Sequence, residues 1–187
     1  MSVTVVSGVP GVGLSALAVR ARQQLTDEYE LVNFGDVMLE QAALRDLATR
    51  RSALGELSRR ETRRLQRRAG EYVADRAEAA AVICTTHLAV ETDAGFLPGL
   101  PPGVLEDVEP DRFVLVEAAP ETIRERRGEA DRAYGEASAR AIEFEQDLGR
   151  TAAFEYAVAV DAPVQLVEND GPLEAGAAAL ADVLAGE

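Results

Sequence analysis

The chain has 187 residues, of which 47% are hydrophobic, and its formal net charge is −14. This composition excludes a disordered chain and favours one globular domain over residues 1–187. No apolar run approaches the roughly 18 to 20 residues that a membrane helix needs, and residues 1–6 lack the basic segment of a signal peptide. We therefore expect a cytoplasmic protein without a membrane segment.

All 19 basic residues are arginines, against 33 acidic residues. An acidic chain without lysine is typical of a halophilic protein, because concentrated salt screens its self-repulsion. A GC-rich genome would favour the same composition, and the sequence leaves both explanations open. The acidity makes nucleic acid an unlikely partner. Cys84 is the only cysteine, which excludes an internal disulfide and agrees with a reducing compartment.

Short apolar runs alternate with helical patterns along the chain. Asp36 is the expected N-cap of the second helix, and Ser58 with Glu61 forms a capping box at the start of the third. Glycine and proline predict a loop over 95–103. In chain order we expect strand 3–7, helix 15–24, strand 31–34, helix 36–47, helix 58–79, strand 81–84, strand 113–116, helix 136–160, strand 164–167 and helix 173–184.

This alternation of strands and helices is typical of an α/β fold with a parallel sheet and helices on both faces. Right-handed crossovers place the loops that follow the strands at one edge of the sheet. We find no internal repeat and no low-complexity linker. A ligand site is therefore expected where the strands end.

A phosphate-binding loop follows the first strand. Residues 8–15 match the pattern G-x-x-x-x-G-K-[S/T], except that Leu14 replaces the lysine. Losing that charge should weaken phosphate binding or transfer by roughly ten- to a hundredfold. The Ser15 hydroxyl is a candidate Mg²⁺ ligand. A glycine-rich turn without a ligand is the alternative. The expected ATP-binding residues are Gly8, Val9, Pro10, Gly11, Val12, Gly13, Leu14, Ser15 and Ala16.

Together with this loop, several segments resemble the archaeal adenylate kinase family. The segment 95–101, Gly-Phe-Leu-Pro-Gly-Leu-Pro, is more specific than the glycine loop. The similarity keeps its order over nearly the whole chain. The matching segments are 6–13, 32–38, Thr86-His87, 95–101, Glu117-Ala118 and 167–169.

The resemblance implies a three-layer P-loop fold with a five-stranded parallel sheet. It also implies a homotrimer that transfers the terminal phosphoryl of ATP to AMP with Mg²⁺. The AMP side would be a helical insertion at about 36–79, and a lid would span about 126–140. Arginine suits such a site because its fork binds phosphate oxygens bidentately. The implied catalytic residues are Arg126, Arg132 and Arg150, and the AMP-binding residues are Phe34, Gly35, Met38, Arg51, Thr86, His87 and Gly95.

Several positions depart from the family pattern. Thr85 replaces an aspartate that can order the water around Mg²⁺, and Gly149 replaces an asparagine. Gly55 and Tyr134 replace arginines, and Leu14 replaces the loop lysine. These departures keep open two alternatives to an adenylate kinase. One is a regulatory nucleotide-binding protein with weakened catalysis, and the other is a kinase with a different phosphoryl acceptor.

Other residues allow more than one interpretation. The arginines of 59–68 lie in two i,i+4 rows, which fit a solvated helix face, a subunit interface or, least well, a nucleic-acid contact. His87 suits a role beside the phosphates or AMP, and equally a structural hydrogen bond. No second histidine or cysteine has ligand spacing for a metal site. Cys84 is expected in the core.

Overall fold

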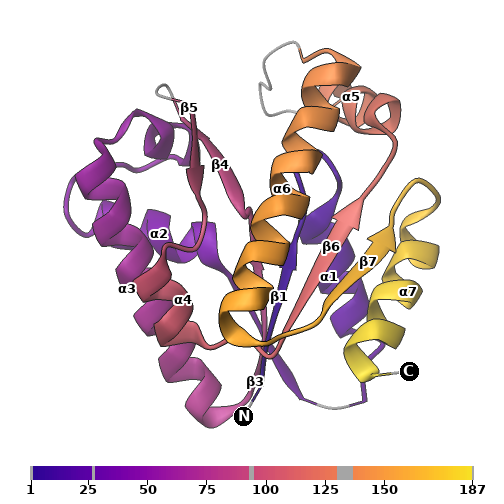
Figure 1. The fold of residues 1–187 in the computed structure, drawn as a ribbon, viewed down its shortest axis with the longest axis horizontal. Helices are drawn as coiled ribbons and strands as arrows, with labels where there is room; N and C mark the ends of the chain where they lie inside the picture. Colours follow the sequence, from indigo (N-terminus) through magenta and orange to yellow (C-terminus); the bar gives the residue numbers. More distant parts are fainter. Residues whose placement is uncertain (1, 27, 93–94, 130–136, 187) are drawn as a thin grey trace.

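The computed structural model describes residues 2–26, 28–92, 95–129 and 137–186. Five parallel strands form the central sheet in the order β2-β3-β1-β6-β7 (Figure 1). This confirms the predicted α/β fold with a five-stranded parallel sheet. The strands are β1 (Val3–Ser7), β2 (Tyr29–Asn33), β3 (Ala81–Thr86), β6 (Arg112–Glu117) and β7 (Val164–Glu168).

Helices cover both faces of the sheet, and the core is accordingly split in two. Val5 of β1 belongs to the cluster on one face and Val6 to the cluster on the other, as the two-residue period of a strand requires. The first face is covered by α2 (Phe34–Ala43), α3 (Arg59–Ala79), α4 (Pro102–Val108) and α6 (Ala139–Val160). The second is covered by α1 (Leu14–Arg22), α5 (Pro120–Glu129) and α7 (Leu173–Ala185).

The N-caps of α2 and α3 were both predicted from the sequence. The capping box of α3 is confirmed, since Ser58 and Glu61 exchange both hydrogen bonds. The N-cap predicted for α2 is wrong. Asn33 caps that helix by accepting from the backbone N–H of Asp36, so Asp36 lies in the first turn. Asn33 is thus both the last residue of β2 and the N-cap of α2, so the helix begins at Phe34.

The loop predicted over 95–103 is also wrong in part. Residues Gly95–Pro98 form β5, which pairs antiparallel with β4 (Ala89–Thr92) in a two-stranded ribbon. Pro102 then opens α4, because a proline in the first turn gives up no helical hydrogen bond. The helix α5 was not expected, and the helix predicted at 136–160 begins at Ala139 behind its cap, Ser138. A short 3₁₀ helix, η1 (Arg51–Glu56), joins α2 to α3.

No helix in the described part of the chain is both long enough and apolar enough to cross a membrane.

Cys84 lies in the middle of β3 with 1% of its surface exposed, as predicted. Burial raises the pKa of its thiol to about 12. At pH 8 the reactive thiolate is therefore about one part in ten thousand. We expect a chromogenic disulfide reagent to leave the native protein unlabelled for hours and to label it at once in denaturant. Rapid labelling of the native protein would show that β3 opens readily.

Candidate functional site

The phosphate loop runs from the carboxyl end of β1 into α1. Gly11 and Gly13 have φ angles of 88° and 92°, which are left-handed conformations that favour glycine. Gly13 is the N-cap residue of α1. The loop thus ends at the first free N–H groups of a helix, where an anion is stabilised.

Side chains from outside the loop hydrogen-bond three alternate loop carbonyls. Nδ1 of His87 donates to Gly8 O at 2.6 Å, since a carbonyl can only accept. Nε of Arg127 donates to Pro10 O at 2.7 Å. In a trans peptide the next N–H points away from the carbonyl. Holding the carbonyls of Gly8 and Pro10 therefore turns the N–H groups of Val9 and Gly11 the other way.

The third carbonyl, Val12 O, accepts two hydrogen bonds. Nη1 of Arg126 donates at 3.1 Å from the last turn of α5, and Nδ2 of Asn169 donates at 2.8 Å from behind β7. Among the described residues, the amide oxygen of Asn169 is the one buried side-chain polar atom without a partner. Gly13 packs against this amide, because a Cβ on it would lie 3.1 Å from Asn169 Nδ2.

The next three residues of the loop lie in the first turn of α1. Leu14 is 8% exposed and packs in the core cluster beside α7, so its side chain belongs to the core. Ser15 and Ala16 are exposed. Only the Ser15 hydroxyl is therefore open to a metal-bound phosphate from this turn.

Few of the described residues near the loop could bind Mg²⁺. Thr85 is 3% exposed, and its hydroxyl lies 3.5 Å from Val32 O, so it offers no ligand to the loop. No group of three histidine, cysteine or acidic side chains that could hold a metal ion occurs among the described residues. Mg²⁺ commonly keeps several waters and binds through substrate phosphates, and Ser15 fits that mode.

Arg127 and Glu145 form a largely buried ion pair that was not predicted from the sequence. The two guanidinium nitrogens Nη1 and Nη2 donate to the two carboxylate oxygens of Glu145 at 3.1 and 2.6 Å. The two side chains are 8% and 13% exposed. Arg127 directly follows Arg126, so adjacent arginines in a helix were the available signal. Asn169 was also absent from the predicted site residues, although it ended a matching segment.

Arg150 is surrounded by carboxylates. Its Nε and Nη2 donate to the two oxygens of Glu117 at 2.8 and 2.7 Å. Its Nη1 donates to Glu143 at 3.0 Å and to Asp147 at 2.7 Å. The hydrogen bonds to Glu117 raise the pKa of Arg150 more than any other contact, and its charge is held at the end of β6. Arg132 and Tyr134 lie outside the described residues.

The residues predicted for AMP fall into separate places. Arg51 lies against Gly35 and donates to Asn33 Oδ1 at 3.2 Å and to Asp36. Phe34 is 2% exposed within the main core, and Met38 packs half-buried between two clusters.

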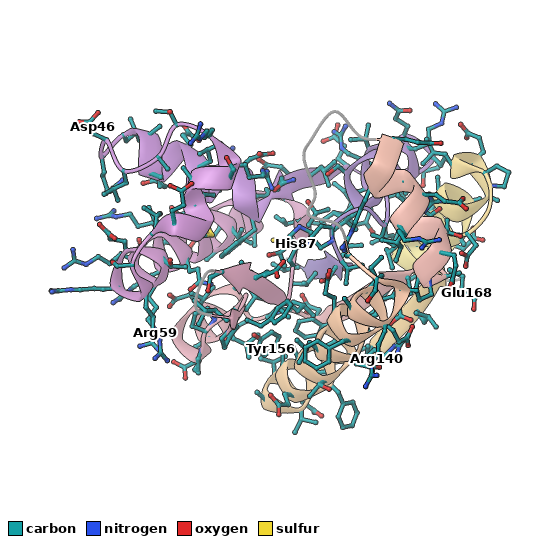
Figure 2. The ribbon with its side chains drawn as sticks, turned by 90° about the horizontal axis from the view of Figure 1, so that it is seen from above. Asp46, Arg59, His87, Arg140, Tyr156 and Glu168 are labelled. Carbon is teal, nitrogen blue, oxygen red and sulfur yellow. The ribbon has the colours of Figure 1, made fainter. Side chains whose placement is uncertain are left out.

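The remaining three AMP-side predictions lie after β2 and α2 in the chain. Thr86 ends β3, and His87 follows it at the phosphate loop. Figure 2 shows His87 in the middle of the molecule, between the α2–α3 part and the α5–α6 part. Gly95 is exposed in the β4–β5 ribbon with a φ of 104°. The structure thus brings Gly35 and Arg51 together, and it brings His87 to the phosphate loop.

The arginines of the Arg59–Arg68 segment belong to the first half of α3. A hollow of about 560 Å³ lies beside α3 and is lined by Arg45, Leu47, Glu61, Arg64, Leu65, Arg67, Arg68 and Glu71. Arg59 stands at the rim of the molecule, far from His87 (Figure 2). The interpretations of this segment stay open.

Comparison with solved structures finds the same fold in shikimate kinases. The chain superimposes on a shikimate kinase from Bacteroides thetaiotaomicron with a TM-score of 0.65 over 98% of both chains, at 16% identity. A shikimate kinase from Acinetobacter baumannii gives 0.62 over 100% of this chain and 94% of that one, at 13% identity. At such identities the likeness concerns the fold alone.

Comparison of sequences gives the family. A family model described as an AAA domain matches residues 7–148. The adenylate kinase of Methanopyrus kandleri is 41% identical over 172 residues, covering 89% of this chain and 88% of that protein. The adenylate kinase of Methanothermobacter thermautotrophicus is 38% identical over 186 residues, covering 98% and 100%. With such identities over nearly the full length of both proteins, this chain belongs to the archaeal adenylate kinase family.

Proposed function

We propose that this protein is an adenylate kinase, which transfers the terminal phosphoryl of ATP to AMP and yields two ADP. The observation that carries the proposal is the phosphate loop, whose carbonyls at Gly8, Pro10 and Val12 are all held from outside. Family membership supplies the reaction. A halophilic cytoplasmic homotrimer of archaeal origin completes the proposal, and the acidic lysine-free composition supports its halophilic part.

The phosphates of ATP would lie on the loop, with the N–H groups and the N-terminus of α1 as donors. Arg126 stands beside the last turn of the loop and would supply the positive charge that Leu14 cannot. Ser15 would bind Mg²⁺ together with the phosphates. When bound, the metal neutralises charge on the transferred group. No general base is needed, because the phosphate of AMP is already ionised at neutral pH.

The acceptor would bind across the site, near Gly35 and Arg51. The guanidinium of Arg51 is already oriented by Asn33 and Asp36, and it is 32% exposed, so it can meet a phosphate. Thr86 and Gly95 would flank the AMP, and Phe34 would support its site from the core. In this proposal the two nucleotides would lie on opposite sides of His87.

Arg150 would need to exchange carboxylates for phosphate oxygens in order to contact the transferred group. Its 41% exposed side chain makes this exchange feasible, and Arg132 would approach from the lid. A phosphoryl group carries more charge than one carboxylate, and arginine binds both in the same bidentate geometry. The pair with Glu117 would thus hold Arg150 until a substrate arrives.

Leu14 and Thr85 favour a second candidate, a relative that binds nucleotides with weakened catalysis and a regulatory role. The two positions that normally serve the phosphate and the metal here point into the protein. Gly55, which stands where the family has an arginine, favours a different acceptor in the same way, and a Cβ placed on it would meet open space. Nucleotide binding without turnover, or turnover with another nucleoside monophosphate, would identify these relatives.

The test is the disproportionation of ADP into ATP and AMP by purified protein in molar potassium chloride. We expect turnover that requires Mg²⁺ and stops on chelation. Replacing Arg150 by alanine should lower kcat at least about tenfold, because one charge-assisted contact to the transferred group is lost. Unchanged melting of the variant serves as the folding control. Intact ATP binding without turnover of the original chain would refute the kinase and favour the regulatory relative.

A further inference from the structure

The contacts of Arg127 join three elements at one point. The residue lies in the last turn of α5. Its Nε donates to Pro10 O of the loop, and its terminal nitrogens donate to the carboxylate of Glu145 in α6. Each guanidinium nitrogen in these three bonds has an acceptor at 3.1 Å or less. The carboxylate of Glu145 therefore holds the guanidinium in the position from which Nε bonds the loop.

The aliphatic stem of Arg127 also contacts the loop. A Cβ on Gly11 would lie 2.6 Å from Cγ of Arg127 and 3.1 Å from its Nε. The stem thus packs directly on the glycine, and the side chain is 8% exposed. Packing and hydrogen bonding act on the same peptide, the one between Pro10 and Gly11.

This peptide matters because the loop lacks a lysine. Binding here depends on N–H groups that point at the phosphates before the ligand arrives, since preorganised donors need no rearrangement. The N–H of Gly11 points opposite the Pro10 carbonyl. Whatever holds that carbonyl therefore aims the Gly11 N–H.

We propose that Arg127 and Glu145 form a positioning pair that aims the Gly11 N–H at the nucleotide phosphates. The pair touches no substrate and acts through the loop. This inference rests on the proposed nucleotide site and adds to it a way in which a loop without lysine keeps its affinity. The exposed pair Arg20–Glu174, with side chains 47% and 61% exposed, joins α1 to α7 and provides the matched control.

The first test uses the nucleotide-free protein, so it does not depend on kinase activity. The variants Glu145→Gln and Arg127→Lys keep the size of the side chain and lose the charge or the fork. Amide hydrogen exchange of the 8–13 segment should become at least about tenfold faster in both, while exchange in α3 stays unchanged. Glu174→Gln should change neither segment. Unchanged exchange of the loop in both variants would overturn the inference.

The second test measures the function of the pair by calorimetry with ATP and Mg²⁺. We expect the Kd for ATP to rise about tenfold in each single variant and no further in the double variant, because both changes break one unit. The KM for AMP should stay within twofold. Loss of ATP binding in Arg127→Lys alone would mean that Arg127 contacts the nucleotide directly, and equal losses for ATP and AMP would mean general destabilisation. Either result would overturn the positioning role.

Discussion

Replacing Gly8 by alanine is expected to weaken ATP binding about a hundredfold, since a misplacement of about 1 Å can cost that much. A Cβ at this position would lie 2.6 Å from Val116 O and 2.7 Å from Val12 Cγ1. The carbonyl belongs to β6, an inner strand held between β1 and β7, and cannot yield, so the loop must move away. Calorimetry with ATP and Mg²⁺ measures the loss directly.

The control for this substitution is Gly103→Ala in α4. Nothing lies within 4 Å of a Cβ placed on Gly103, and its helix is remote from the loop in sequence. This variant should bind ATP as the original chain does and melt at the same or a slightly higher temperature. If Gly8→Ala also bound ATP within twofold of the original chain, the loop would not be the phosphate site.

Local patterns predicted most of the fold. The five strands and the capping box of α3 follow from short apolar runs and from Ser58 with Glu61, both of which depend on neighbours in sequence. The β4–β5 ribbon was not predicted, because glycine and proline dominate the segment 95–103 and indicate a loop. The two strands form through pairing with each other, with Val90 opposite Leu97. Tertiary pairing thus overrode the local turn signal.

The site was predictable at the loop and less so around it. The order of glycines places the phosphate loop, because its backbone conformation needs them at Gly11 and Gly13. The direction of a side chain does not follow from such a pattern. Leu14 lies in the core, and Arg127 meets Glu145 from a different helix across residues that carry no motif. Contacts between two elements depend on how those elements pack against each other, and a single sequence does not reveal that packing.

Replacing Arg126 by alanine should lower kcat between about 100- and 1,000-fold, the usual cost of one preorganised donor to a developing charge. The guanidinium lies at Val12 O, and a Cβ on Gly13 would be 4.0 Å from its Nη1, so it stands at the entrance to α1. With Leu14 in the core and no lysine in the chain, no neighbouring loop residue can replace this charge. Steady-state kinetics of ADP formation measures the effect.

Two comparisons make the Arg126 prediction specific. Arg124 lies on the same helix, is exposed, and makes an ideal control, because its loss changes the net charge by the same amount. Arg124→Ala should therefore keep kcat within about twofold, the range expected for an exposed charge. Arg126→Lys should retain part of the activity, since it keeps the charge and loses the fork. Equal losses in Arg124→Ala and Arg126→Ala would mean that overall charge, and not the contact with the loop, governs the reaction.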